Sequence, residues 1–255
     1  MRLGFIGTGA ITAHMLRGLK TSVLADWQVL LSPRNVEIAH DLATTLPGVA
    51  IAVDNQAVID GSDLIVLAVR PQVAESVLRP LQFYPETPLI SLIATLQIDT
   101  LRQWTGAQTI CRAIPLPFVE RHHDVTPVFP AIPQAMQLFN ALGRALAVDD
   151  LAAFDAYGTA SALMASYFGL VETAANWLSN QGISQPDADA YLRGLFANLG
   201  NSLAASPLSL DALRIGHSTQ GGLNEQLHRE FEAKGGSAAL EAGLEAVLAR
   251  IKAAD

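Results

Sequence analysis

Cysteine and basic residues are scarce in this sequence of 255 residues, which has one cysteine, Cys111, and 16 Lys and Arg against 24 Asp and Glu. A single cysteine excludes an internal disulfide and is typical of a chain kept in a reducing compartment. With a net charge of −8 and no run of basic residues, the chain is a poor partner for nucleic acid or an anionic membrane surface. It also lacks HExxH, P-loop and nucleophile-elbow motifs.

Long apolar runs are missing as well. The apolar segment Gly158–Ala175 is interrupted by Glu172, which favours a packed helix over a membrane span. The N-terminus enters a strand pattern directly, without the basic region and apolar core of a secretory signal. Because half of the residues are hydrophobic, we expect a compact, soluble, cytoplasmic protein rather than a disordered one.

The most informative motif that is present lies near the N-terminus. An apolar strand pattern runs into Gly7-Thr8-Gly9 and then into a helical pattern that starts with Ala10-Ile11. A strand, a glycine pair and a helix in this order bind the pyrophosphate of a dinucleotide. Gly7 permits the tight turn, and Gly9 lets the backbone approach the phosphates at the helix start. Thr12 stands where the fingerprint usually has Gly or Ala, and an ordinary turn is the alternative interpretation.

Strand and helix patterns alternate through the first 150 residues. The runs that favour strands are Arg2–Ile6, Trp27–Leu31, Ala50–Val53, Leu64–Val69, Leu89–Ile93, Thr109–Ile114, Asp124–Phe129 and Arg144–Val148. Helical patterns between them include Val36–Leu46, Val73–Leu81 and Gln134–Leu142. Such alternation predicts an α/β fold with a parallel sheet covered by helices on both faces.

After Asp149 the strand patterns end, and Ala and Leu recur at helical spacing. Helices are predicted over Leu151–Tyr157, Ser161–Gln181, Pro186–Ala205, Leu208–Ile215, Gly222–Lys234 and Ser237–Lys252. We therefore expect a Rossmann-type dinucleotide-binding domain over residues 1–150 and an all-helical domain over residues 151–255.

The end of the second predicted strand bears on the choice of cofactor. A domain that binds NAD usually carries Asp or Glu there, to hold the ribose 2′-hydroxyl. This sequence has Ser32, Arg34 and Asn35 instead, and Asn35 can also cap the following helix. An arginine and a hydroxyl suit a 2′-phosphate, which predicts NADP, while a solvated turn with an incidental arginine is the alternative.

Several segments together resemble the pyrroline-5-carboxylate reductase family over nearly the whole chain. Gly4-Phe5-Ile6-Gly7-x-Gly9 is similar to that family's opening, and Asn55 followed by Asp63–Gln72 is similar to its Asn and its D-V-I-x-L-A-V-K-P-Q block. Ser91–Ala94 resembles S-x-A-A, and Arg112–Pro115 resembles R-x-M-P. Near the end, Ser218–Gly222 resembles T-S-P-G-G, and Lys234–Ala239 resembles E-x-G-G-x-R-A.

The resemblance implies an NADPH-binding N-terminal domain and a helical C-terminal domain that interleaves with a second subunit, with an imine site at the dimer interface. The motifs and the resemblance together predict the cofactor residues Gly7, Thr8, Gly9, Ala10, Ile11, Ser32, Arg34, Asn35, Asn55, Ala68, Val69, Arg70, Pro71 and Ala94. Of these, Ala68, Val69, Pro71 and Ala94 are expected on the nicotinamide side. The predicted substrate residues are Ser161, Ser218, Thr219, Gly221 and Gly222, with backbone N–H groups near the last two holding a carboxylate.

The substrate half departs from the family pattern. R-x-M-P continues as Leu116-Pro117-Phe118 instead of Asn-Thr-Pro, and Thr159–Met164 replaces the S-G-S-G-P-A helix start. Asn224 stands in place of a threonine proposed to assist protonation. An amide is no proton relay at neutral pH, so we expect Asn224 to orient an imine whose proton comes from solvent or is already bound. The departures point to a different cyclic imine, a bulkier or more apolar substrate, or lost activity.

Two other functions remain open at this point. A β-hydroxyacid dehydrogenase shares the two-domain plan but relies on a lysine in its helical domain, and this chain has no lysine between Asp149 and Ala233. An NADP-binding sensor or inactive paralogue is compatible with the altered substrate motifs.

Other residues with chemical potential have plainer interpretations. His122-His123-Asp124 has metal-ligand residue types, but neighbours on a strand point to opposite faces, so we expect a polar loop and no metal site. We interpret His217 as a helix cap or surface residue and Cys111 as an inert core thiol.

Overall fold

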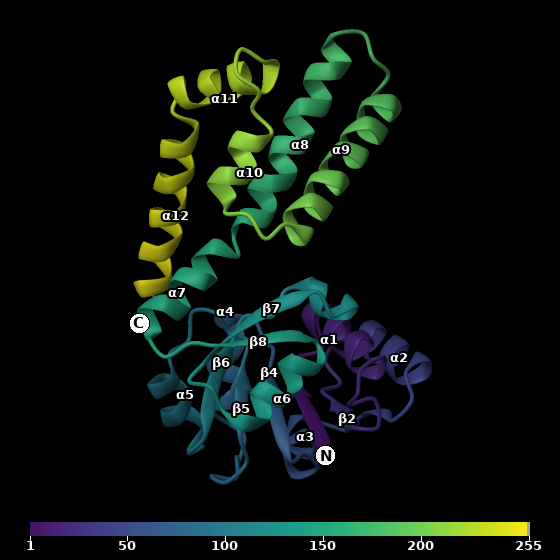
Figure 1. Cartoon of the computed structure of the whole chain (residues 1–255). Coiled ribbons are helices and arrows are strands. Elements are labelled where there is room, and N and C mark those ends of the chain that lie inside the picture. Colours follow the sequence, from purple (N-terminus) through teal and green to yellow (C-terminus); the bar gives the residue numbers. More distant parts are fainter. Residues whose placement is uncertain (254–255) are drawn as a thin grey trace. The chain divides into compact units, whose positions relative to one another are not determined.

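The computed structural model describes residues 1–253, which form two compact units (Figure 1). One unit comprises Met1–Thr159 and the residues from Leu248 on, and the other comprises Ala160–Val247. The division differs from the expected one at residue 150 because helix α7 (Leu151–Ala160) packs on the first unit. Phe154 of this helix is buried, with its ring 5.9 Å from the ring of Phe129.

The first unit is built on one eight-stranded sheet. Its strands are β1 (Arg2–Ile6), β2 (Gln28–Leu31), β3 (Val49–Ile51), β4 (Leu64–Leu67), β5 (Leu89–Ser91), β6 (Ile110–Ala113), β7 (Asp124–Phe129) and β8 (Gly143–Ala147), in the order 3-2-1-4-5-6-7-8. The predicted α/β fold is confirmed, but β6 and β7 pair antiparallel. A parallel return needs a long crossover, whereas only the short 3-10 helix η1 (Pro117–Arg121) joins these strands.

Helices cover both faces of this sheet. One face is packed by α1 (Ala10–Lys20), α2 (Val36–Thr45) and α6 (Pro133–Ala141), and the other by α3 (Asn55–Asp60), α4 (Pro71–Leu78) and α5 (Ile98–Thr105). Successive residues of β4 alternate between the two cores: Leu64 and Val66 belong to one, Ile65 and Leu67 to the other. A strand buried on both sides reads as a continuous apolar run, as β4 does.

Cys111 lies on β6 inside the first of these cores. Its side chain is fully buried, and this burial raises the pKa of the thiol to about 12. The thiol is therefore protonated at neutral pH and unreactive, as predicted.

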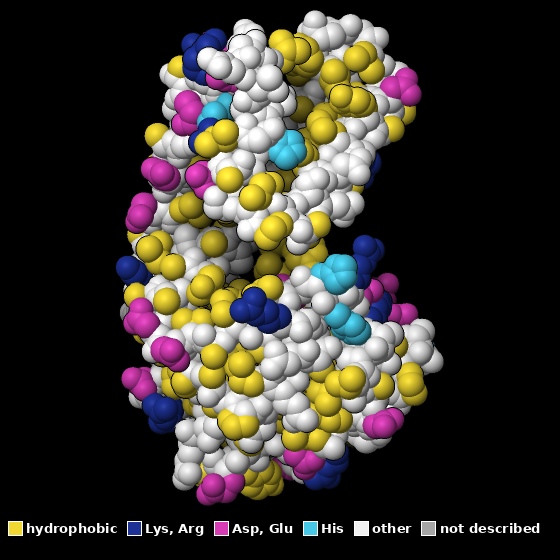
Figure 2. Space-filling view, viewed as in Figure 1, with side chains coloured by type: hydrophobic (Ala, Val, Ile, Leu, Met, Phe, Trp, Pro, Cys, Tyr) yellow, Lys and Arg dark blue, Asp and Glu magenta, His cyan; other side chains and the backbone are white. Residues whose placement is uncertain are grey.

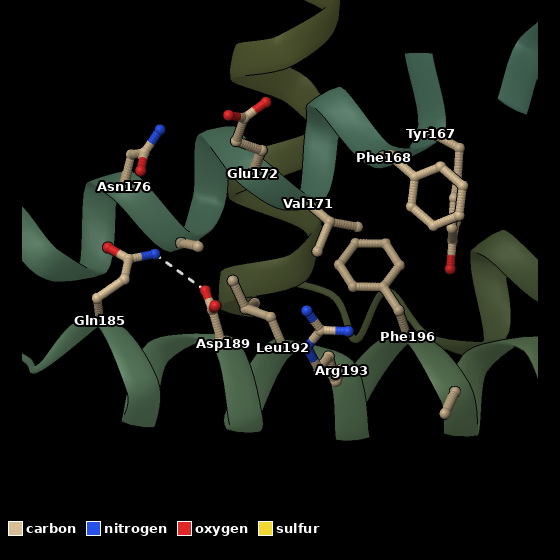
Figure 3. Close-up of a pocket in the computed structure, with 12 residues that line it drawn as sticks. Tyr167, Phe168, Val171, Glu172, Asn176, Gln185, Asp189, Leu192, Arg193 and Phe196 are labelled. Atoms are coloured by element: carbon tan, nitrogen blue, oxygen red, sulfur yellow. Dashed lines mark hydrogen bonds between the residues drawn. The ribbon is translucent and has the colours of Figure 1, made fainter. Parts of the chain in front are cut away.

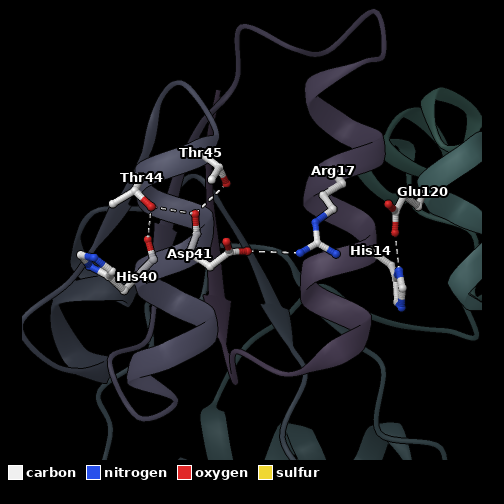
Figure 4. A network of polar contacts seen from close by, with 7 residues as sticks. All are labelled: His14, Arg17, His40, Asp41, Thr44, Thr45 and Glu120. Atoms are coloured by element: carbon white, nitrogen blue, oxygen red, sulfur yellow. Dashed lines mark hydrogen bonds and ion pairs between the residues drawn. The ribbon is translucent and has the colours of Figure 1, made fainter.

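Polar contacts fasten α1 to its neighbours, as Figure 4 shows. His14 Nδ1 lies 2.5 Å from Glu120 Oε2 in η1, and Arg17 pairs with Asp41 of α2 at 3.2 Å. His122 has a left-handed φ of 58°, and its Nε2 donates to the carbonyl oxygen of Gly18 at 2.8 Å. His122 thus caps the end of α1, and within residues 1–253 no three His, Cys, Asp or Glu side chains group as metal ligands.

The second unit consists of helices with little core of their own. They are α8 (Leu163–Asn180), α9 (Gln185–Ala205), α10 (Leu210–Gly216), α11 (Leu223–Ala233) and most of α12 (Gly236–Lys252), each within two residues of its predicted ends. Of the hydrophobic side chains in residues 160–247, all of which the structure describes, only those of Ala175, Ala188 and Leu192 are buried. None of the helices formed by residues 1–253 has the length and apolar character needed to cross a membrane.

Candidate functional site

The glycine turn that follows β1 borders a cleft at the carboxyl ends of β1 and β4. The cleft encloses about 510 Å³ and is lined by Gly7, Thr8, Gly9, Arg34, Asn35, Val36, Ala68, Val69, Arg70 and Val73. Eight of these ten are predicted cofactor residues, and Val36 and Val73 are additional. The strand order reverses between β1 and β4, and this is where an open α/β sheet binds its ligands.

The two glycines of the turn meet different demands. Gly7 has a φ of +107°, and a Cβ there would stand 2.5 Å from the backbone carbonyl group of Ala68. Gly9 is the N-cap of α1, and a Cβ on it would meet nothing within 4 Å among the described residues. The fold therefore requires Gly7, whereas Gly9 leaves open space before the first N–H groups of α1, where an anionic group fits.

Buried hydroxyl groups hold the turn in place. Thr12 Oγ1 donates to the carbonyl oxygen of Gly7 at 2.8 Å, which explains how a threonine fits where the fingerprint has a small residue. Ser32 Oγ accepts the N–H of Gly7 at 2.9 Å, and Thr8 Oγ1 donates to the carbonyl oxygen of Ser32 at 2.9 Å. The Ser32 hydroxyl is buried against the turn, and its expected contact with a 2′-phosphate stays a prediction.

Arg34 and Asn35 are exposed where they line the cleft. Arg34 forms no ion pair or hydrogen bond with another residue of the described part of the chain, so its guanidinium group is available to a phosphate. Asn35 occupies the N-cap position of α2, but the predicted side-chain capping bond is not formed.

The other predicted cofactor residues lie at element ends outside the cleft lining. Ala10 and Ile11 begin α1, Asn55 begins α3, and Pro71 begins α4. Ala94 follows β5 and is exposed. No contact in the structure decides whether these five residues touch a cofactor, so their roles stay predictions.

Arg112 is the residue near Ala94 that the sequence analysis left out of the site. Its buried guanidinium group donates to the carbonyl oxygen of Ala94 at 2.5 Å and to Gln97 Oε1 at 3.0 Å. It also pairs with the buried Asp155 at 3.6 Å and lies 4.8 Å from the ring centre of Phe154. One cation thus joins the loop after β5 to β6 and α7. The available signal was a charged residue inside an apolar strand pattern, which implies a buried partner.

The predicted substrate segment forms the connection from α10 to α11. Gly221 has a φ of +72° and donates its N–H to Glu225 Oε2 at 2.7 Å. Gly222 donates its N–H to the carbonyl oxygen of Thr219 at 2.8 Å. The two N–H groups expected to hold a substrate carboxylate are therefore used within the chain.

The side chains of Asn224 and His217 form hydrogen bonds with the backbone in and next to the connection from α10 to α11. Asn224 Nδ2 donates to the carbonyl oxygen of His217 at 2.7 Å, while the His217 ring donates through Nδ1 to the carbonyl oxygen of Leu213 at 2.8 Å. His217 is the C-cap of α10, in line with its predicted capping role. Ser218 lies beside it in the same connection, and Ser161 lies in the turn between α7 and α8.

Known proteins resemble the chain along its whole length. Residues 2–95 match a family model described as "NADP oxidoreductase coenzyme F420-dependent". A pyrroline-5-carboxylate reductase of Pseudomonas aeruginosa is 26% identical, and the match covers 98% of this chain and 95% of the relative. The solved pyrroline-5-carboxylate reductase of Streptococcus pyogenes has a TM-score of 0.85 at 22% identity, covering 99% of this chain and 98% of that one. The NADP-bound Plasmodium falciparum pyrroline carboxylate reductase has a TM-score of 0.82 at 17% identity, covering 100% and 98%.

Two alanine substitutions separate the roles of the glycines. Gly7→Ala should lower the free energy of unfolding by about 1–3 kcal/mol, because its Cβ is strained at this φ and meets the Ala68 backbone. Gly9→Ala should change stability by less than about 0.5 kcal/mol, yet weaken dinucleotide binding by entering the open space. Denaturant unfolding and a fluorescence titration with NADPH measure the two effects. Wild-type binding by Gly9→Ala would show that no phosphate approaches this backbone.

Proposed function

We propose that the chain, which is similar to pyrroline-5-carboxylate reductases over nearly its whole length, reduces the C=N bond of a cyclic imine with NADPH as the reductant. The observation that carries the proposal is the cleft at the glycine turn, in a chain that aligns with a named reductase over 98% of its length. The open space at Gly9 and the exposed Arg34 fit the pyrophosphate and the 2′-phosphate of NADPH.

The chain's own residues bind and orient rather than supply an acid. When bound, reduced nicotinamide supplies a hydride to the imine carbon. Ala68, Val69 and Val73 give the cleft an apolar wall, and its lining, within the described residues, holds no Asp, Glu or His. A protonated C=N group is already electrophilic, so the proton on nitrogen comes from solvent or arrives with the substrate. Asn224, on the second unit, is proposed to orient that substrate.

We propose that a second copy of the chain covers the helices of the second unit. An apolar cavity of about 690 Å³ opens between α8 and α12, lined by residues such as Leu170, Leu240 and Leu244. A second cavity of about 540 Å³ lies between α8 and α9, where the Tyr167 ring stands 5.6 Å from that of Phe196 (Figure 3). Hydrophobic side chains are also spread over the surface of this unit in Figure 2. So much exposed apolar area is typical of an interface between subunits.

Steady-state oxidation of NADPH tests the proposed reaction. The purified chain should oxidise NADPH in the presence of a five-membered cyclic imine and form the corresponding amine. Rates with 3-hydroxy acids and NADP⁺ should stay at background, because the chain has no lysine between Asp149 and Ala233 to serve such a substrate. NADPH binding without turnover of any imine would favour a sensor over an enzyme.

Arg34→Ala tests the cofactor preference. The substitution should weaken NADPH binding by about 1.5–3 kcal/mol, because it removes a charge-assisted contact to the 2′-phosphate, and should leave NADH binding nearly unchanged. Arg102→Ala is the matched control, since Arg102 is an equally cationic, exposed side chain of α5, paired with Asp99 and outside the cleft lining. Equal losses for both dinucleotides would contradict a role in 2′-phosphate recognition.

Light scattering at micromolar concentration tests the second copy. The wild-type chain should be at least a dimer, and Leu170→Asp should shift it toward monomer by placing a charge in the apolar cavity. Val23→Asp, on the most exposed hydrophobic position of the first unit, is the control and should leave the mass unchanged. A monomeric wild-type chain would refute the proposal.

A further inference from the structure

A buried arginine supports the turn that follows β5. Arg112 lies on β6, and only 2% of it is exposed. Its Nη2 donates to the carbonyl oxygen of Ala94 at 2.5 Å, and its Nη1 donates to Gln97 Oε1 at 3.0 Å. The same guanidinium group lies 3.6 Å from Asp155 Oδ1 of α7 and 4.8 Å from the ring centre of Phe154. One planar cation thus joins β6, the loop after β5 and α7.

Stability alone does not call for a cation at this place. Moving a charge out of water is costly, and apolar residues of similar volume often replace a buried ion pair without loss of stability. An apolar side chain, however, cannot donate to a backbone carbonyl group. A lysine offers a single nitrogen, whereas a guanidinium group presents its donors in a fixed plane and reaches several acceptors at once. The contacts of Arg112 therefore indicate that it orients the groups around it, the Ala94 carbonyl group among them.

The turn that Arg112 supports lies at the same edge of the sheet as the cofactor cleft. β4 and β5 are parallel neighbours, so their carboxyl ends meet at this edge. The N–H of Leu92, just after β5, donates to the carbonyl oxygen of Leu67 at the end of β4 at 2.9 Å. Ala94 stands exposed in the turn that follows, and Ala68, the residue after Leu67, lines the cleft. Arg112 thus acts on the part of this edge where the nicotinamide half of NADPH is expected.

We infer that Arg112 is a positioning residue for the nicotinamide half of NADPH: it holds the Ala94 turn beside the end of β4 and, being buried, does so without touching the cofactor. The inference rests on the proposed binding of NADPH in the cleft. The adenosine half is left to other residues, since Arg34, which lines the cleft, is proposed to hold the 2′-phosphate. The two halves of the cofactor should therefore respond to different substitutions.

Calorimetry with two ligands separates these halves. NADPH carries the nicotinamide ring, whereas 2′-phospho-ADP-ribose has the same adenosine and phosphates without it, so the wild-type chain should bind NADPH more tightly. Arg112→Lys keeps the charge beside Asp155 but cannot serve every acceptor. It should weaken NADPH binding about tenfold and change the affinity for 2′-phospho-ADP-ribose by less than about twofold. Arg112→Met combined with Asp155→Leu removes both buried charges and should have the same effect on the two ligands.

Two control variants identify the other causes of a weaker affinity. Arg34→Ala should weaken both ligands by the same factor, because both carry the 2′-phosphate. Leu138→Ala, at a fully buried position of α6, should lower the stability of the fold without changing the ratio of the two affinities. A loss of NADPH binding that came only from a less stable fold would appear in Leu138→Ala as well.

The outcomes separate this inference from the proposed function. If the wild-type chain binds neither ligand, the proposed use of NADPH fails and this inference fails with it. If both ligands bind but NADPH binds no more tightly, or the Arg112 variants change both affinities by the same factor or neither, only the role of Arg112 is overturned. The same holds if Leu138→Ala shifts the ratio as far as Arg112→Lys does. Should the double variant not fold, Arg112→Lys decides alone.

Discussion

The close approach of the Gly7 backbone to the end of β4 is the constraint on which the cofactor cleft depends. A Cβ at Gly7 would overlap the carbonyl group of Ala68, so only glycine lets the turn lie against that strand. The buried hydroxyl groups of Thr12 and Ser32 then hold both faces of the turn. With the turn fixed in this way, Gly9 and the start of α1 face open space, and the exposed Arg34 lines the same cleft.

A buried arginine, Arg112, connects further parts of the first unit. Arg112 holds the Ala94 carbonyl group and Asp155 at once, so the loop after β5 and helix α7 share one support. Removing one partner of such a pair leaves the other charge buried and is strongly destabilising. The second unit has little buried core, since its hydrophobic residues are mostly exposed. This exposure is the reason why we propose that a second copy covers its helices.

The start of α11 is a place where the chain satisfies its own polar groups. Around α11 the Gly221 N–H is used by Glu225 and the Asn224 amide by His217. The N–H group of Gly221 and the side-chain amide of Asn224 are thus used within the chain. The cofactor half contrasts with it, because the start of α1 has no capping side chain among residues 1–253 and no acidic residue in its first turn.

Apolar patterning and glycine placement by themselves determined the alternation of strands and helices, the helices after residue 150, and the gathering of Gly7–Gly9, Arg34 and Ala68–Arg70 at one cleft. These are local signals, because apolar residues recur at every second position in a strand and about every 3.6 positions in a helix, and both patterns can be read from the sequence. The short helices α3 and α5, the antiparallel β6–β7 pair, and the packing of α7 on the first unit came only with the tertiary structure. So did the burial of Ser32, the contacts of Arg112 and the hydrogen bond from Gly221 to Glu225. Each of these depends on which groups meet after folding, because a hydroxyl or a carboxylate bonds to whichever donor or acceptor the fold brings within reach, and residue type alone does not specify that partner.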